Sequence, residues 1–185
     1  MENSFLSSSI KQFEYYKSLG DKTFEQLDFS EMQKEFAEDS NSISIIVKHM
    51  VGNMLSRWTN FLTEDGEKSW RHRDQEFEDT YQSKEDMLHA WEKGWDCVFN
   101  ALTPLENDDL EKIIYIRNQG HTVTEAINRQ LAHYAYHVGQ IVFLGKLLKG
   151  SHWKSLSIPK GKSKDFNTEK FGQEKSRRHF TDDLQ

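Results

Sequence analysis

Proline and cysteine are scarce in this sequence, and each shortage limits the kinds of fold and cellular location that we expect. There are only two prolines, Pro104 and Pro159, which favours long helices because proline removes a backbone donor and clashes with the preceding turn. The single cysteine, Cys97, cannot form an internal disulfide, which predicts a reducing, cytoplasmic location. Its place in the apolar run "WDCVF" favours a buried, inert thiol over a nucleophile.

The chain also lacks a long apolar run and an excess of basic charge. No stretch approaches the roughly 18 apolar residues of a membrane span, and the first residues show neither the basic segment nor the apolar core of a signal peptide. The formal net charge is −6, whereas binding to a phosphate backbone needs clustered lysine and arginine. We therefore expect no membrane partner and no nucleic-acid partner.

The length, the composition and the spacing of the apolar residues predict one helical domain with a single core. The 185 residues are 36% hydrophobic and 29% charged, a balance that suits helices with solvated outer faces. Apolar residues recur at three- and four-residue spacing in four segments, which predicts four long helices. The predicted helices cover residues 3–27, 41–62, 83–102 and 122–150. Good N-caps stand at three of the starts: Ser42, Ser83 and Thr122, the last forming a capping box with Glu125.

The length of the connectors between these helices predicts whether neighbouring helices are parallel or antiparallel. Residues 63–82 are charged and have no helical period, and at about 3.3 Å per extended residue they can cross the length of a bundle. Antiparallel neighbours need only a short loop, so we expect the second and third helices to be parallel. The predicted fold is all-α, an up-down-down-up four-helix bundle. Before the fourth helix, "KIIYIRNQG" is typical of a short strand or hairpin arm, although an irregular segment fits equally well.

The composition changes after Gly150. Residues 151–185 hold eight Lys/Arg and five Asp/Glu, a net of +3, which leaves 16 minus 25, or −9, for the remainder. Three apolar side chains, Trp153, Leu156 and Ile158, predict an ordered arm that packs on the helices. We expect the bundle to occupy residues 1–165 and a flexible charged tail to occupy residues 166–185.

Two histidines, His133 and His137, stand four residues apart inside the fourth predicted helix. With eight histidines in the chain, the spacing alone is a weak signal. Their position strengthens it, because a helix that is apolar almost all round is usually buried, and a buried imidazole must find a partner. The spacing places both rings on one helix face, where two nitrogens can reach one cation.

His49 is the strongest candidate for a third ligand. It lies midway along the second predicted helix, and small or polar residues on its face leave space beside the ring: Gly52, Asn53 and Ser56. At 1.5 Å rise per residue, its level matches that of the histidine pair if the two helices are antiparallel. The pattern leaves open that all three are ordinary core or surface histidines. The remaining histidines are expected to be solvated: His72, His89, His121, His152 and His179.

A lone histidine in the second helix, followed by H-x-x-x-H and "GQI" in the fourth, resembles the DinB-like (YfiT-type) superfamily. The runs "HYAYHVGQIVFLGK" and "SLSIPKGKS" are similar to an uncharacterised bacterial branch of it, over about residues 1–165. The resemblance implies a four-helix bundle that binds one divalent metal through His49, His133 and His137. It also implies a homodimer. Some members transfer low-molecular-weight thiols such as bacillithiol to electrophiles, and others resemble isomerases or hydrolases.

Three classes of function are compatible with these residues. The first is a metal-dependent enzyme that acts on a small molecule by thiol transfer or hydrolysis, because three neutral imidazoles leave a cation, Zn²⁺ or Ni²⁺ by ligand type, its charge and an open position. The second is a non-catalytic bundle that binds a metal or a small ligand. The third is a structural dimer with incidental histidines. The sequence identifies no general base; Asn53 either orients a water or ligand or fills polar space.

Overall fold

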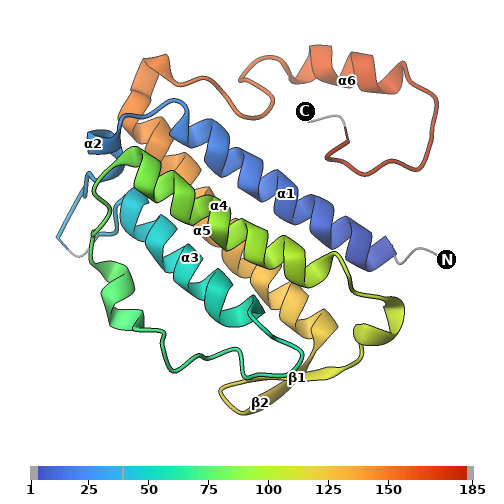
Figure 1. The fold of residues 1–185 in the computed structure, drawn as a ribbon. Helices are drawn as coiled ribbons and strands as arrows, with labels where there is room; N and C mark the ends of the chain where they lie inside the picture. The colour runs from blue at the N-terminus through green and yellow to red at the C-terminus, as the bar shows by residue number, and fades with distance from the viewer. Residues whose placement is uncertain (1–3, 39, 183–185) are drawn as a thin grey trace.

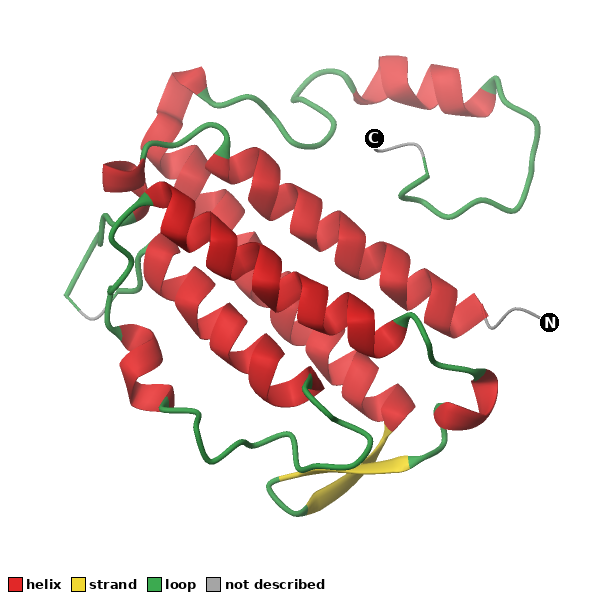
Figure 2. Cartoon of the chain, in the orientation of Figure 1, coloured by secondary structure: helices red, strands yellow, loops and turns green. Residues whose placement is uncertain are grey.

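The computed structural model describes residues 4–38 and 40–182, which form a mainly helical chain with one two-stranded sheet (Figures 1 and 2). The four long helices are α1 (Ser4–Phe24), α3 (Ile43–Trp58), α4 (Lys84–Leu102) and α5 (Val123–Lys149). Two short helices accompany them, α2 (Phe29–Met32) and α6 (Ser163–Phe171). The predicted helix start at Asn3 and the last three residues of the predicted tail lie outside the described residues. No described helix is both long enough and apolar enough to cross a membrane.

Three of the long helices begin where the sequence predicts, because the capping side chains make the expected hydrogen bonds. The hydroxyl oxygens of Ser42 and Ser83 each accept the backbone N–H three residues later, at 3.2 and 3.1 Å. The Thr122 hydroxyl accepts the N–H of Glu125 at 3.1 Å, and the Glu125 carboxylate accepts the N–H of Thr122 at 2.8 Å. Each cap satisfies backbone donors that the first helical turn leaves free.

Two of the long helices are shorter than predicted. α1 ends at Phe24, and a turn leads to Asp28, which begins the separate helix α2. α3 ends at Trp58, and Asn60 then adopts a left-handed backbone conformation with φ of 50°. A left-handed residue directs the chain out of the helix, so residues 59–62 form turns instead of one further turn of α3.

The long helices run in two directions. In Figure 1, α1 and α5 point one way, and α3 and α4 point the other way. Contacts between α3 and α4 advance together along both helices: Gly94 lies against Val51, and Cys97 lies near Thr59. The connector between them runs back along α3 and includes the 3₁₀ helix η1 (Arg73–Phe77). The second and third long helices are therefore parallel, as the length of the connector predicts.

A β-hairpin precedes α5 at the end of the molecule where α3 and α4 finish (Figure 1). Its strands, β1 (Ile113–Ile116) and β2 (Gln119–Thr122), pair antiparallel around Arg117 and Asn118, whose φ values are 55° and 59°. Positive φ at both turn residues matches the right-handed twist of paired strands. The second and fourth residues of β1 are buried. The prediction of a short strand or hairpin arm in this segment is confirmed. The prediction of an all-α fold is wrong in this respect, because the chain also contains a small two-stranded sheet.

The core between the helices is rich in aromatic side chains. Trp95 of α4 contacts Phe13 of α1 and Tyr134 of α5, with ring centroids 6.2 and 5.6 Å apart. The Tyr134 hydroxyl donates to Oδ1 of Asn53 and accepts from Nε1 of Trp58, both at 3.1 Å. Such aromatic pairs add about 0.5–1.5 kcal/mol each beyond the area they bury, and the hydroxyl bonds fix α5 against α3.

An ordered arm follows α5, as predicted, although only part of it is buried. Trp153 is half-buried and packs against α5 at Gly145. The Gln26 side chain accepts the Lys154 N–H at 2.8 Å and donates to its carbonyl oxygen at 3.2 Å. Ile158 is 42% exposed, contrary to the prediction, because the chain has already left the helices at this point.

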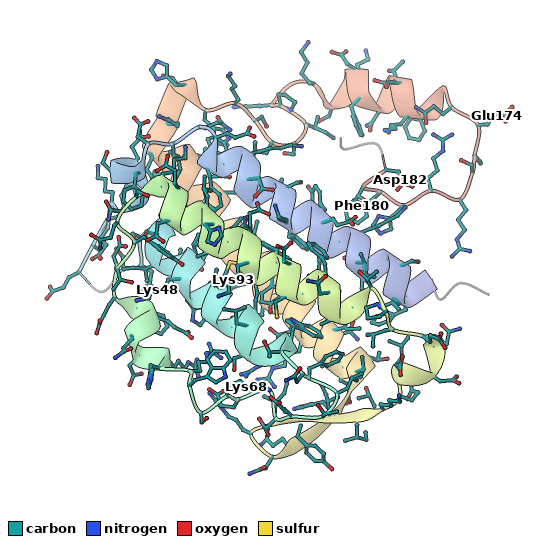
Figure 3. The ribbon with its side chains drawn as sticks, viewed as in Figure 1. Lys48, Lys68, Lys93, Glu174, Phe180 and Asp182 are labelled. Carbon is teal, nitrogen blue, oxygen red and sulfur yellow. The ribbon has the colours of Figure 1, made fainter. Side chains whose placement is uncertain are left out.

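The chain beyond the arm returns to α1. α6 spans the predicted boundary between residues 165 and 166. After it, Asp182 pairs with Lys11 at 2.6 Å, and the ring of Phe180 lies 5.5 Å from that of Tyr15. Figure 3 shows Phe180 and Asp182 on the part of the tail that lies along α1. Phe180 is 56% exposed, so these contacts bury little apolar surface.

Deleting residues 169–185 is predicted to change stability only slightly. Exposed ion pairs contribute little because water and salt screen them. The other described contacts of the tail are a half-exposed ring pair and one hydrogen bond between His179 and Ser8. The midpoint of thermal unfolding should fall by no more than about 4 °C, the shift that about 1 kcal/mol gives in a chain of this size. A deletion that begins at Ser151 also removes Trp153 and should lower the midpoint further; equal losses from both deletions would contradict this account.

Candidate metal centre

The three histidines singled out from the sequence lie together between α3 and α5. Each offers a ring nitrogen, and these nitrogens all lie within 4.8 Å of one another. Nε2 of His133 is 3.4 Å from Nε2 of His49 and 3.1 Å from Nε2 of His137. The four-residue spacing places His133 and His137 on one face of α5, and the antiparallel run of α3 brings His49 to the same level. The three residues can therefore bind one metal ion.

A carboxylate from the connector holds the outer nitrogen of His49. Nδ1 of His49 lies 3.0 Å from Oε2 of Glu76, and Arg71 donates to both oxygens of that carboxylate at 2.6 and 2.9 Å. Burial alone would raise the pKa of Glu76, but the hydrogen bonds from Arg71 and His49 outweigh it and hold this pKa below its usual range. The ionised carboxylate accepts Nδ1–H of His49, so Nε2 is the nitrogen of this ring that faces the other two histidines.

Gly52 makes this arrangement sterically feasible. A methyl group added at Gly52 would lie 2.2 Å from Oε1 of Glu76, well inside van der Waals contact. The sequence indicates free space on this face of α3 but does not reveal that a carboxylate from the connector occupies it. Glycine inside a helix lowers stability by about 1 kcal/mol relative to alanine. At position 52 this loss is accepted because only glycine lets Glu76 come close enough to bind His49.

Gln140 holds the outer nitrogen of His137 in a similar way. Oε1 of Gln140 lies 2.8 Å from Nδ1 of His137, and Nε2 of Gln140 donates to the Tyr136 hydroxyl at 3.1 Å. Because the amide oxygen can only accept, Nδ1 of His137 carries the proton and Nε2 keeps its lone pair. Two of the three rings thus have the partner on the outer nitrogen that metal-binding histidines usually have.

His133 differs from its two neighbours. Its Nδ1 is buried and has no hydrogen-bond partner within residues 4–38 and 40–182. Burial, followed by the charges of His137 and His49, lowers the pKa of His133 to about 3, and burial also lowers the pKa of His137. Both rings are therefore neutral near pH 7, which is the form that binds a metal.

The inward nitrogens cannot satisfy one another by hydrogen bonding alone. Nε2 of His49 and Nε2 of His137 are both acceptors, and His133 can donate one N–H to only one of them. A divalent cation accepts a lone pair from all three. Nitrogen ligands at about 2.0–2.1 Å from a tetrahedral ion lie roughly 3.3 Å apart, close to the observed 3.1 and 3.4 Å. The donor set and its spacing fit a divalent metal.

A cavity of about 220 Å³ adjoins this group, and His49 and His133 form part of its wall. Asn53, Gln130 and five arginines line the rest. Oδ1 of Asn53 accepts a hydrogen bond from the Tyr134 hydroxyl. This hydrogen bond shows Asn53 as a polar residue that supports the core; its role in orienting a water or ligand stays a prediction.

Cys97 stands apart from the three histidines. It is half-buried, its Sγ lies 3.6 Å from the Thr59 hydroxyl, and burial raises the pKa of its thiol. A raised pKa lowers the fraction of thiolate, which is the reactive form. This environment agrees with the inert thiol expected from the sequence.

The other histidines follow the prediction in part. Three of them are exposed: His72, His89 and His152. His121 is half-buried, because it pairs across the hairpin with buried Ile114 and shares that residue's inward face. His179 is also half-buried, and its Nε2 lies 3.0 Å from the Ser8 hydroxyl of α1. The expectation that these two are solvated is wrong, because a strand pairing and a tail contact cannot be recognised from sequence spacing.

Comparison with known proteins assigns the chain to a family. A family model described as "Protein of unknown function (DUF1572)" matches residues 1–162. This match covers most of the chain and includes all three histidines, so the chain belongs to that family. No curated protein matches the sequence.

Gly52→Ala is predicted to destabilise the metal-free protein by about 1–3 kcal/mol, the usual cost of forcing extra volume into a packed site. The added methyl group would displace the buried Glu76 carboxylate. Gly139→Ala on α5 is the matched control, because a methyl group there meets nothing within 4 Å and should stabilise the helix by about 0.5–1 kcal/mol. Urea unfolding measures both changes; the same sign for the two variants would show that Gly52 does not admit Glu76.

Proposed function

We propose that this protein is a DinB-like metalloenzyme that acts on a small molecule, and that its helices form the up-down-down-up four-helix bundle of that superfamily. The observation that supports the proposal most directly is the convergence of three imidazoles with their Nε2 atoms 3.1 and 3.4 Å apart. The family match names no activity, so the proposed chemistry rests on the site and on the sequence resemblance.

In this proposal His49, His133 and His137 bind the ion through Nε2. Imidazole ligands suit Zn²⁺ and Ni²⁺, and these are the first candidates. A divalent ion held by three neutral ligands keeps its charge and an open position, and it supplies Lewis-acid activation of a thiol or a water near neutral pH. Glu76 and Gln140 keep two of the rings in the tautomer and orientation that binding requires.

The side chains around the cavity favour thiol transfer over hydrolysis. No carboxylate lines the part of this cavity that the structure describes, so no general base is placed to take a proton from water. A free thiol is a much stronger acid than free water, so a thiol needs less activation by the ion to lose its proton. In the proposed reaction a small thiol loses its proton to water and its sulfur attacks an electrophilic carbon. A C–S bond forms, and the bond from that carbon to its leaving group breaks. Hydrolysis is the second candidate.

A non-catalytic bundle that binds a metal or a small ligand is the alternative function. The same lack of a general base supports it, since binding requires no proton transfer. The two proposals differ in one measurable respect, because only an enzyme turns over. A screen of small thiols with electrophilic acceptors, and of hydrolysable esters and amides, separates them when it is run with metal-loaded protein.

His49→Ala and His137→Ala should each abolish stoichiometric metal binding and any turnover, because two remaining ligands hold a divalent ion poorly. Glu76→Gln keeps all three ligands and should weaken the affinity for metal by about 10–100-fold. His152→Ala is the control, since His152 is exposed on η3 (Gly150–His152), and it should change neither property. Elemental analysis of tag-free protein measures the metal content; retention of metal by the His49 and His137 variants would rule out the three-histidine site.

We also propose that the protein is a homodimer that pairs through the outer face of α5. Large apolar side chains are exposed there, with exposed fractions of 62% for Tyr136, 65% for Phe143 and 52% for Leu147. Ala132 lies on the same face and is small enough to let a second helix approach closely. Neighbouring exposed apolar residues of this kind mark an interaction surface, and pairing of identical faces gives a closed dimer.

Phe143→Glu should convert this dimer to a monomer, because it places a charge at the centre of the apolar face. Sedimentation velocity measures the change. Phe171→Glu makes the same substitution at another exposed phenylalanine, on α6, and should leave the dimer intact. A monomeric wild-type protein, or a dimeric Phe143 variant, would refute pairing through α5.

A further inference from the structure

The cavity beside the three histidines collects most of the arginines of the chain. The sequence has seven arginines, and therefore 24 minus 7, or 17, lysines. Five of the arginines and none of the lysines line the cavity. They come from α3, the following connector, the hairpin turn and α5, and they are Arg57, Arg71, Arg73, Arg117 and Arg129. Such a selection is not expected for general surface charge on a chain whose net charge is −6.

Carboxylates balance only part of this positive charge. Glu76 accepts two hydrogen bonds from Arg71, and Glu67 is shared by Arg57 at 3.3 Å and Arg117 at 3.1 Å. Three of the five guanidinium groups share these two carboxylates, so the group keeps a net charge of 5 minus 2, or +3, and two arginines have no ion pair. A further carboxylate, Asp65, accepts backbone N–H groups at the hairpin turn and does not line the cavity.

The two remaining arginines are free to bind a ligand. The side chains of Arg73 and Arg129 make no hydrogen bond and no ion pair with any other residue that the structure describes. Both side chains are exposed, one at the start of η1 and the other on α5, and both line the cavity. A planar guanidinium presents paired donors that match the two oxygens of a carboxylate or a phosphate, which a lysine cannot do.

Buried polar atoms without partners point independently to a missing ligand. Gln130 is 3% exposed, and its Oε1 has no partner among the described residues. Arg57 is 7% exposed; its Nη1 donates to the Gly66 carbonyl, but its buried Nε lacks a partner in the described part of the chain. An unsatisfied buried polar group is costly. Both side chains line the cavity. A bound anion can accept a hydrogen bond from Nε of Arg57, whereas Oε1 of Gln130 needs a donor, such as a hydroxyl group of the same ligand.

We propose that this cavity binds one small molecule that carries at least two carboxylate or phosphate groups, and that this anion is the substrate, or part of it, held beside the metal. The second half of this statement rests on the proposed function, whereas the binding of an anion does not. A volume of about 220 Å³ is smaller than the roughly 300–1,000 Å³ of pockets for drug-sized ligands. It suits a compact polyanion and is too small for a nucleic-acid strand.

The cavity lies where a bound anion would be held next to the proposed metal site. His49 and His133 form part of its wall, whereas His137 does not. An anion held by Arg73 and Arg129 would therefore lie next to two of the three imidazoles. Binding energy from such remote charged groups can place the reacting end of a substrate without itself taking part in the chemistry, so the arginines are positioning residues.

Calorimetric titration of the metal-free full-length protein at constant pH and ionic strength tests the proposal. The probes form two series: acetate, succinate and citrate carry one, two and three carboxylates, and inorganic phosphate and pyrophosphate represent phosphate ligands. We expect one site per chain and an affinity that rises with charge within each series. The series that binds more tightly identifies the chemical source of the anion. Absence of binding in both series, or equal affinity for acetate and citrate, would overturn the proposal.

A matched pair of variants places the anion in this cavity. The double variant Arg73→Gln and Arg129→Gln removes the two unpaired arginines and should weaken binding of the best probe by at least about tenfold, the usual effect of losing hydrogen bonds to a charged group. The double variant Arg177→Gln and Arg178→Gln removes equal charge from the exposed tail and should change the affinity less than twofold. Equal losses in both would show that only net charge matters and would overturn the proposal.

The same titration separates this proposal from the metal site. His137 does not line the cavity, so His137→Ala should still bind the anion although it no longer binds metal. Retained anion binding in a wild-type protein that takes up no metal would refute the proposed metalloenzyme and leave the anion site standing. A protein that binds stoichiometric metal but none of the probes would refute the anion site alone.

Discussion

The contact on which the site depends is the buried chain that links Arg71, Glu76 and His49. It attaches the connector to α3, sets the tautomer of His49, and places one arginine in the wall of the cavity. Removing one partner of a buried ion pair typically costs about 3–5 kcal/mol, because the other charge is left unpaired. The chain therefore couples three features that are separate in sequence: the fold of the connector, the orientation of a proposed metal ligand, and the charge beside it.

α5 performs three tasks because its faces differ. Tyr134 points into the aromatic core and bonds through its hydroxyl to Asn53 of α3. The adjacent positions His133 and His137 form the inner edge of the site, and Tyr136 is on the outer face, where it accepts a hydrogen bond from Gln140. Since Gln140 also holds His137, an interface on the outer face of α5 would contact the residue that orients a proposed metal ligand.

Local signals in the sequence predict much of the fold and the identity of the histidines. The start of a helix depends on the capping residue and the few residues after it, as at Ser42 and Thr122. The three- and four-residue spacing of apolar side chains indicates which face of a helix is buried. The convergence of His49 with the α5 pair follows from spacing and helix direction. Glu76 could not be predicted, because its connector has no period and its position is set by contacts with α3. Gly52 and Gln140 carried partial signals: a gap beside His49, and an amide three residues after His137.

The arginines escaped prediction for the same reason, since they come from four separate segments and only the folded chain brings them together. Their presence beside a cation site poses an electrostatic problem. Five guanidinium groups repel a divalent ion, and two carboxylates offset only part of that repulsion. A bound polyanion between them would be attracted to both the arginines and the ion. Binding free energies are reciprocal, so whatever the metal adds to the affinity of the anion, the anion adds to the affinity of the metal. Neutral histidines, rather than carboxylates, suit such a site, because they leave the full charge of the ion available to the substrate.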